Sequence, residues 1–335
     1  MTPARLEYKF DKYKAPTIEW CGIPVTRAWR CGNEGNVASV LIEKPGRGDF
    51  LPIVDGGYAL QYSPLMECRE GSGMILFCQL DVTGRTASDP AAQRLARNMV
   101  DYVSGWKAAG VGRKAVYAGA AAGKAHLEKM GVTVGEYDGG ALGADQVLIV
   151  GQGGGRELAG HAKEIGEWVK GGGNLLAVGL DESEVQSFLP FKVTMKKSEY
   201  ITTTFEPFGM NSLLAGVGPA DVHNRDPRIL PLVTGGAKVF GDGVLAQSEN
   251  GNVVFCQLAA WDFDYSKQYN LKRVYRRSSF VLARVLAEMG VAGTTPVVER
   301  IHEPVAAVKA EKRWSEGLYL DQAEEWDDPY RYFGW

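Results

Sequence analysis

The densest group of side chains able to do acid–base chemistry is His223-Asn224-Arg225-Asp226. Asp221 and Glu206 precede it, so an imidazole and carboxylates could act together from one loop region. Such a group could hydrolyse or bind a sugar, or it could be an ordinary solvated loop tip. We take His223, Asp221 and Glu206 as candidate catalytic residues and Arg225 as a candidate binding residue.

A second group of side chains suited to a sugar is Trp261-Asp262-Phe263-Asp264, directly after an apolar strand-like run. Loops at the carboxyl ends of strands are where open α/β sheets bind ligands. The Trp261 indole would stack on a sugar face, and Asp262 and Asp264 would accept bonds from hydroxyl groups. The alternative is that Trp261 is an aromatic plug over the sheet.

A glycine-rich turn, Gly151-Gln152-Gly153-Gly154-Gly155, joins a predicted strand to a predicted helix. Backbone N–H groups at such a turn can cradle an anion, which makes Gly153 and Gly154 candidate binding residues. A dinucleotide site needs its glycine turn after the first strand, whereas this turn follows the third. The alternative is a tight turn that lets the helix pack closely.

The composition describes an ordinary globular protein. The 335 residues are 45% hydrophobic and 23% charged, with a net charge of -3, so we expect no nucleic-acid partner. No stretch is apolar for the roughly 20 residues that cross a bilayer, so we expect no membrane span. The five cysteines form no C-x-x-C pair, and we expect no metal and no cofactor.

The N-terminal segment from Met1 to Phe10 contains no apolar stretch of a secretory signal. We therefore expect a cytoplasmic protein if Met1 is the native start, and leave export open if the chain is part of a longer protein.

An internal repeat organises the chain. The block Leu51–Gly57 (LPIVDGG) reappears as Leu230–Gly236 (LPLVTGG), and the block Ile75–Leu80 (ILFCQL) reappears as Val253–Leu258 (VVFCQL). A predicted helix follows each copy, at 89–106 and at about 270–289. Two blocks in the same order, with nearly equal spacing between the copies, indicate a duplicated unit.

The two copies predict three segments: an incomplete first unit at 1–110, a complete second unit at 111–292 and an aromatic tail at 293–335. The second unit has room for two or three strand–helix pairs between its first strand and Leu230, and the first unit has no such room before Leu51. The first unit therefore lacks its N-terminal strands. We expect an upstream domain or a separate subunit to complete it.

Alternating strands and helices predict an α/β fold with a doubly wound, mostly parallel sheet in the second unit. The expected strands are 114–118, 132–134, 145–150 and 174–178, with a helix at about 156–170. The region from 191 to 244 is expected to hold shorter strands and loops.

The order of these elements resembles the class I glutamine amidotransferase fold, a flavodoxin-like architecture. Asp145–Gly155 resembles the oxyanion strand of that family, and Val178-Gly179-Leu180-Asp181-Glu182 lies where the nucleophile elbow should be. Leu180 stands where the family has cysteine, and no histidine occurs in 259–264, after the last strand. The resemblance therefore implies two related amidotransferase-like sheets without amidotransferase activity.

Gly73–Arg85 and Trp326–Trp335 resemble the C-terminal regions of large bacterial glycoside hydrolases, and the trimerisation domain of family 42 β-galactosidases uses the same fold for assembly. The resemblance implies a non-catalytic structural module of a carbohydrate-active enzyme that forms an oligomer. The alternatives are a glycoside hydrolase, or a sugar-binding subunit, with its site in the loops at the sheet edge. The aromatic tail is expected to dock on a neighbouring domain or subunit, or within this chain.

Overall fold

The computed structural model describes residues 17–20, 23–26, 42–56, 60–80, 82–108, 112–224, 226–268 and 271–295, the first two ranges by their backbone alone. These residues divide into two compact units. One unit holds the described residues up to 108 except Pro45–Asp49, and the other holds Pro45–Asp49 and the described residues from 112 onward. From residue 296 on, the predicted docking tail lies outside the described residues.

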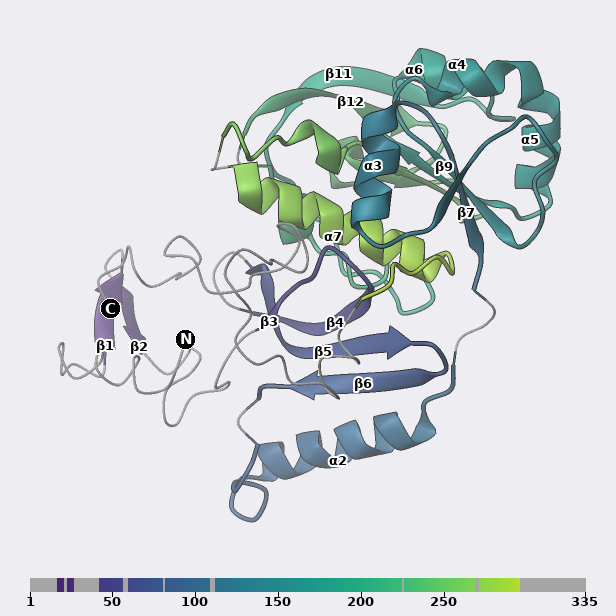
Figure 1. The fold of residues 1–335 in the computed structure, drawn as a ribbon. Coiled ribbons are helices and arrows are strands. Elements are labelled where there is room, and N and C mark those ends of the chain that lie inside the picture. The colour runs from purple at the N-terminus through teal and green to yellow at the C-terminus, as the bar shows by residue number, and fades with distance from the viewer. Residues whose placement is uncertain are drawn as a thin grey trace. The chain divides into compact units, whose positions relative to one another are not determined.

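The second unit, drawn in teal to green in Figure 1, contains a mixed, mostly parallel seven-stranded sheet. The order of its strands is β13-β14-β15-β10-β9-β7-β8. The five strands from β15 to β8 pair in parallel, and β14 pairs antiparallel with both β13 and β15. Numbered along the chain, the parallel strands stand in the order 2-1-3-4-5, which is the flavodoxin-like order. Their bounds are β7 (Lys114–Ala118), β8 (Val134–Glu136), β9 (Gln146–Val150), β10 (Asn174–Val178), β13 (Lys238–Phe240), β14 (Leu245–Gln247) and β15 (Val253–Cys256).

Helices cover both faces of this sheet, which explains why its central strands are continuous apolar runs. One face packs against α3 (Ala121–Lys129) and α7 (Lys272–Glu288), with Leu127 and Leu282 in its core. The other face packs against α4 (Gly154–Leu158), α5 (Ala162–Lys170) and α6 (Glu182–Gln186), with Leu158 and Ile165 in its core.

The single helix expected at 156–170 is broken. The helix α4 ends at Leu158, the 3-10 turn η3 covers Ala159–His161, and α5 begins at Ala162. The sequence Ala159-Gly160-His161 contains a glycine, a poor helix former, so the amphipathic pattern continues while the helix does not.

The region from 191 to 244 holds a two-stranded antiparallel ribbon of β11 (Thr194–Tyr200) and β12 (Arg228–Gly235). Three short 3-10 turns follow along the chain: η4 (Pro219–Val222) lies between β11 and β12, η5 (Gly241–Gly243) between β13 and β14, and η6 (Ala260–Asp262) between β15 and α7. The strands and loops expected for this region are therefore present.

The first unit is built from β3 (Ile42–Glu43), β4 (Asp49–Gly56), β5 (Tyr62–Glu70), β6 (Gly73–Cys78) and the helix α2 (Pro90–Gly105). A separate antiparallel hairpin joins β1 (Thr17–Trp20) to β2 (Ile23–Thr26). The mostly parallel sheet predicted for this unit is wrong for its described strands, because β5 pairs antiparallel with both β3 and β6. In the second unit the repeated blocks lie in β12 and in β15. There, too, the hairpin of β14 and β15 is antiparallel.

The hairpins β5–β6 and β14–β15 share one register. Leu65 pairs with Cys78 in the first unit, and Leu245 pairs with Cys256 in the second. The N–H of Gln79 donates to Pro64 O at 2.7 Å, and the N–H of Gln257 donates to Val244 O at 2.8 Å. Both cysteine thiols donate to the carbonyl two residues on, in Leu80 and Leu258. The second repeated block, Ile75–Leu80 and Val253–Leu258, thus forms the same hairpin in both units.

Within the described residues, no helix is both long enough and apolar enough to cross a bilayer.

Candidate functional site

The candidate site is the carboxyl edge of the parallel sheet, defined as the loops that follow β7, β9, β10 and β15. These loops are 119–120, 151–153, 179–181 and 257–264. Ligands of open α/β sheets bind at this edge, at the point where the strand order reverses. Here that point lies between β7 and β9.

Leu180 lies in the bend between β10 and α6, the position at which the sequence resemblance implied a nucleophile elbow. The bend is made at Gly179, whose φ of +65° is a left-handed conformation that glycine adopts readily. Leu180 is 0% exposed and belongs to the core under α4, α5 and α6. A nucleophile elbow presents its reactive atom to the substrate, whereas this bend buries an aliphatic side chain.

The Glu184 carboxylate occupies the backbone donors beside this bend. Its Oε1 accepts the N–H of Gly153 at 2.6 Å, and its Oε2 lies 3.5 Å from the N–H of Asp181. The same glutamate forms a capping box, since Asp181 Oδ1 accepts the Glu184 N–H at 3.1 Å. The bond from the Ser183 hydroxyl, followed by that from Glu184 N–H, lowers the pKa of Asp181. An incoming anion would have to displace Glu184 from these N–H groups.

Tyr117 is a buried side chain of β7 whose hydroxyl lies among the loops that follow β7 and β9. Its hydroxyl donates to Ala120 O at 2.9 Å, and a Cβ at Gly123 or Gly151 would overlap that hydroxyl. Burial, followed by the charge of Glu157, raises the pKa of Tyr117 to about 12. A side chain of the sheet thus packs against the glycines at the switch point.

Gln152 ties the loop after β9 to the loop after β15. Its Oε1 accepts the Trp261 indole N–H at 3.3 Å, and its Nε2 donates to Asp262 Oδ2 at 3.0 Å. Trp261 is half-buried, packs against the core and lies 5.9 Å from the His126 ring, centroid to centroid. The indole therefore packs against the core, as the alternative to sugar stacking expects. Sugar binding by Trp261 and Asp262 stays a prediction.

Gly154 allows a close approach of helix to sheet. A Cβ there would overlap the Ala118 carbonyl of β7, and one at Gly155 would meet the backbone of Glu184. Gly153 has a φ of +88°, and its N–H donates to the Glu184 carboxylate. Close packing therefore accounts for these glycines, and anion binding by Gly153 and Gly154 stays a prediction.

Arg228 links the loop that carries His223 and Asp226 to the loop that follows β15. Its Nε pairs with Asp226 Oδ2 at 2.9 Å, and its Nη1 donates to Asp262 O at 2.9 Å. The guanidinium also lies 4.4 Å above the Phe263 ring. Arg225, the predicted binding residue, lies outside the described residues.

The predicted catalytic residues are spread over different environments. Asp221 is buried and accepts the Gly218 N–H at 2.8 Å, which closes η4. His223 ends the same 3-10 turn and is partly buried, whereas Glu206 is exposed in the loop before it. Asp221 thus has a structural hydrogen bond in place, and a catalytic role for the three residues stays a prediction.

Asp264 binds neighbours on its own loop. Its carboxylate pairs with Lys267 at 2.9 Å and accepts the Ser266 N–H at 3.1 Å. The Ser266 hydroxyl bond and then the bond from Lys267 lower the pKa of Asp264 to about 2. Asp264 is exposed, so sugar hydroxyls would compete with these contacts.

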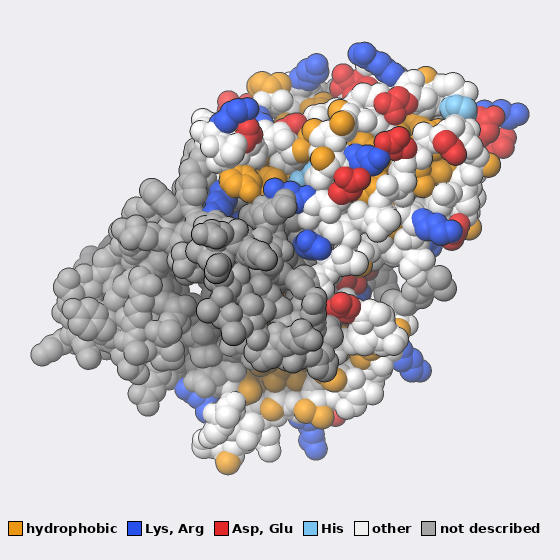
Figure 2. All heavy atoms as spheres, in the orientation of Figure 1, with side chains coloured by type: hydrophobic (Ala, Val, Ile, Leu, Met, Phe, Trp, Pro, Cys, Tyr) orange, Lys and Arg blue, Asp and Glu red, His pale blue; other side chains and the backbone are white. Residues whose placement is uncertain are grey.

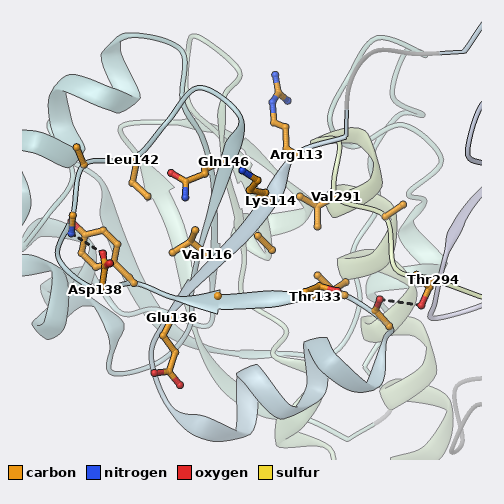
Figure 3. A pocket seen from close by; sticks show the side chains of 18 residues that line it. Arg113, Lys114, Val116, Thr133, Glu136, Asp138, Leu142, Gln146, Val291 and Thr294 are labelled. Atoms are coloured by element: carbon orange, nitrogen blue, oxygen red, sulfur yellow. Dashed lines mark hydrogen bonds between the residues drawn. The ribbon is translucent and has the colours of Figure 1, made fainter.

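A pocket of about 520 Å³ lies away from this edge, over β7 and the edge strand β8 (Figure 3). Val116, Gly135 and Leu142 are among the residues that line it. Two of its charged lining residues form ion pairs: Lys114 with Asp145 at 3.2 Å and Glu136 with Lys124 at 2.6 Å. The lining contains neither histidine nor cysteine.

The described part of the chain contains no group of three or more His, Cys, Asp or Glu side chains placed to hold a metal ion.

No protein-family model and no curated protein matches the chain. Among solved structures, PurLQS from Thermotoga maritima is similar over 53% of this chain and 100% of the matched chain, with a TM-score of 0.33 and 12% identity. A similarity at this level carries no argument about activity.

Sequence reasoning missed the residues that close the edge. The pattern Asp181-x-x-Glu184 is a readable capping signal and could have indicated Glu184. Nothing in the sequence indicated Gln152, Tyr117 or Arg228, because their roles depend on partners brought together by the fold.

Proposed function

We propose that this chain is a non-catalytic structural module with an amidotransferase-like second unit and a related first unit. The observation that carries the proposal is the buried Leu180 at the bend where a nucleophile would be exposed. A leucine side chain cannot attack a carbonyl, and the protein then contributes shape and binding surface.

The contacts at the carboxyl edge support this proposal. Glu184 takes the N–H of Gly153, Tyr117 packs against the glycines at the switch point, and Gln152 binds Trp261 and Asp262. An active site keeps donors open for the charge that develops in the reaction. At this edge the donors named here bind the protein's own side chains.

The setting that we propose is an assembly built around a carbohydrate-active enzyme, in which the chain takes part in an oligomer. This part of the proposal rests on the sequence resemblance of Gly73–Arg85 and Trp326–Trp335 to such proteins. The shared hairpin register of the two units supports the duplication on which the resemblance depends.

Ammonia release from glutamine tests the proposal. The wild-type chain and Leu180→Cys should both release ammonia no faster than buffer, because the thiol would be buried and Glu184 would still occupy the adjacent N–H groups. Leu180→Ala controls for a change in packing. Saturable release by the wild type would contradict the proposal.

A further inference from the structure

The strands β6 and β15 occupy equivalent positions in the two units but differ in their neighbours. The strand β15 lies between β14, which is antiparallel, and β10, which is parallel. Among the described strands, β6 pairs with β5 alone. Within the described residues, the side of β6 that corresponds to the β10 side of β15 is thus a strand edge without a pairing strand.

Hydrogen-bond geometry identifies the backbone groups on that edge. In β15, Asn252 O accepts the Leu175 N–H and Cys256 O accepts the Gly179 N–H, each at 2.9 Å. Bonding direction alternates along a strand, so Val254 faces β10 as well. Alignment of the two repeated blocks makes Met74, Leu76 and Cys78 the counterparts in β6. Gln79 bonds to β5, which places these three on the outer side.

The side chains of β6 also lack the cover that β15 has. Val253, Val254, Phe255 and Cys256 are 0% exposed, whereas every residue from Met74 to Cys78 is partly exposed. The run is Met-Ile-Leu-Phe-Cys, without the charge or proline that normally protects an edge strand.

The helix that follows β6 is similarly uncovered. In α2 the only fully buried residue is Ala92, and Val100 is 64% exposed. In α7, its counterpart, the buried residues run from Val274 to Leu286 without a break. Hydrophobic side chains are visible on the surface in the region of α2 and β6 (Figure 2).

We infer that the outer edge of β6 pairs with a parallel, apolar strand of a partner polypeptide, in the register in which β10 pairs with β15. The inference deepens the proposed role as an assembly module and rests on it. The partner segment is a strand followed by a helix, as β10 is followed by α6.

The second unit shows why this occupant fits. The strand β10 is Asn-Leu-Leu-Ala-Val, uncharged like β6, and it pairs in parallel over Leu175–Val178. Two copies of β6 related by a two-fold axis would pair antiparallel, so a symmetric dimer through this edge does not reproduce the arrangement. Main-chain bonds supply much of the affinity in such strand addition, and side-chain pockets supply specificity.

A labelled peptide of residues 172–182 serves as the probe, because it contains β10 and is a ready-made parallel partner. Titration of the full chain with this peptide, followed by fluorescence anisotropy, should show saturable binding. N-methylation at Leu175 removes the N–H that bonds Asn252 in the second unit and should weaken binding at least about tenfold. N-methylation at Leu176, whose N–H faces the other way, is the matched control.

Variants of the full chain at Leu76 test the β6 side of the pairing. Leu76→Pro removes an outward N–H and leaves the β5–β6 bonds in place, so peptide binding should fall at least about tenfold. Leu76→Val keeps that N–H and should bind as the wild type does. If Leu76→Pro fails to fold, amide exchange in the wild type decides: the peptide should slow exchange at Leu76 and Cys78 and leave Ile75 and Phe77 unchanged.

Absence of saturable binding, or equal binding by both N-methylated peptides, would overturn the inference. So would unchanged exchange at Leu76 and Cys78 with the peptide bound. These results leave the buried Leu180 untouched, whereas ammonia release would overturn the proposed function without bearing on β6.

Discussion

At the scale of single residues, side chains of the protein bond to backbone and side-chain donors at the carboxyl edge, where open α/β sheets bind ligands. Glu184 bonds the Gly153 N–H at 2.6 Å and completes the capping box of α6. A carboxylate on a backbone donor is a charge-assisted hydrogen bond, stronger than a neutral one. The carboxylate that accepts this N–H therefore also stabilises the edge.

Replacing this carboxylate tests its structural role. Glu184→Ala should lower the free energy of unfolding by about 1–2 kcal/mol, because the Gly153 N–H and the helix cap both lose an acceptor. Glu184→Gln keeps a carbonyl acceptor and should lose less. Urea unfolding at neutral pH measures both variants. Equal stability of Glu184→Ala and the wild type would contradict this role.

His126 is a buried histidine of the helix α3. It is 5% exposed, its Nε2 lies 3.3 Å from Ser279 Oγ, and its ring packs edge-on against Tyr275. Burial, followed by the charge of Lys129, lowers the pKa of His126 to about 3. The side chain is therefore neutral in the folded protein at neutral pH.

This depressed pKa makes stability depend on acid. Above pH 6.5, the ordinary value, His126 is neutral in both states and adds no pH dependence. As pH falls from 6.5 towards 3, only the unfolded chain takes up the proton, so stability declines by at most about 1.4 kcal/mol per pH unit. Between pH 7.5 and 5.0 the wild type should lose about 2 kcal/mol more than His126→Gln. An equal loss of unfolding free energy by the wild type and by His126→Gln between the two pH values would contradict this assignment.

At the scale of elements, much of the second unit could be predicted from the sequence. The strands 114–118, 146–150 and 174–178 are apolar runs, and the helix expected at about 270–289 is α7. The break between α4 and α5 was missed, because the apolar positions continue through it. The bonds of Gln152 to Trp261 and Asp262 could not be predicted, since they join loops that lie far apart in the sequence.

The contact between α4 and β7 gives a prediction at this scale. Gly154→Ala would place a methyl group against the Ala118 carbonyl, and should lower the free energy of unfolding by about 1–3 kcal/mol. Gly160→Ala is the matched control, because a Cβ there meets nothing within 4 Å. The control should be neutral within about 0.5 kcal/mol in urea unfolding. A Gly154→Ala variant as stable as the control would show that the approach of α4 is not close.

At the scale of the whole molecule, the two units use the repeated segments in different settings. The helices α2 and α7 have 16 and 17 residues, yet α2 buries only Ala92 fully while most of α7 is buried. Local stability follows buried contacts, so the two helices should differ in how readily they open.

Amide hydrogen exchange measures this difference. The central amides of α2 should exchange at least about tenfold faster than those of α7 at the same pH and temperature, because opening α2 breaks fewer buried contacts. Equal protection of the two helices would mean that α2 is covered in solution.

The central claim is that this protein supplies shape and surface and breaks no bond. The strongest alternative is glycoside hydrolysis by His223, Asp221 and Glu206, so a panel of aryl-glycosides tests the claim most directly. The account predicts that the wild type and His223→Ala both release aryl alcohol at the rate of buffer alone. Saturable release by the wild type that His223→Ala abolishes would contradict it.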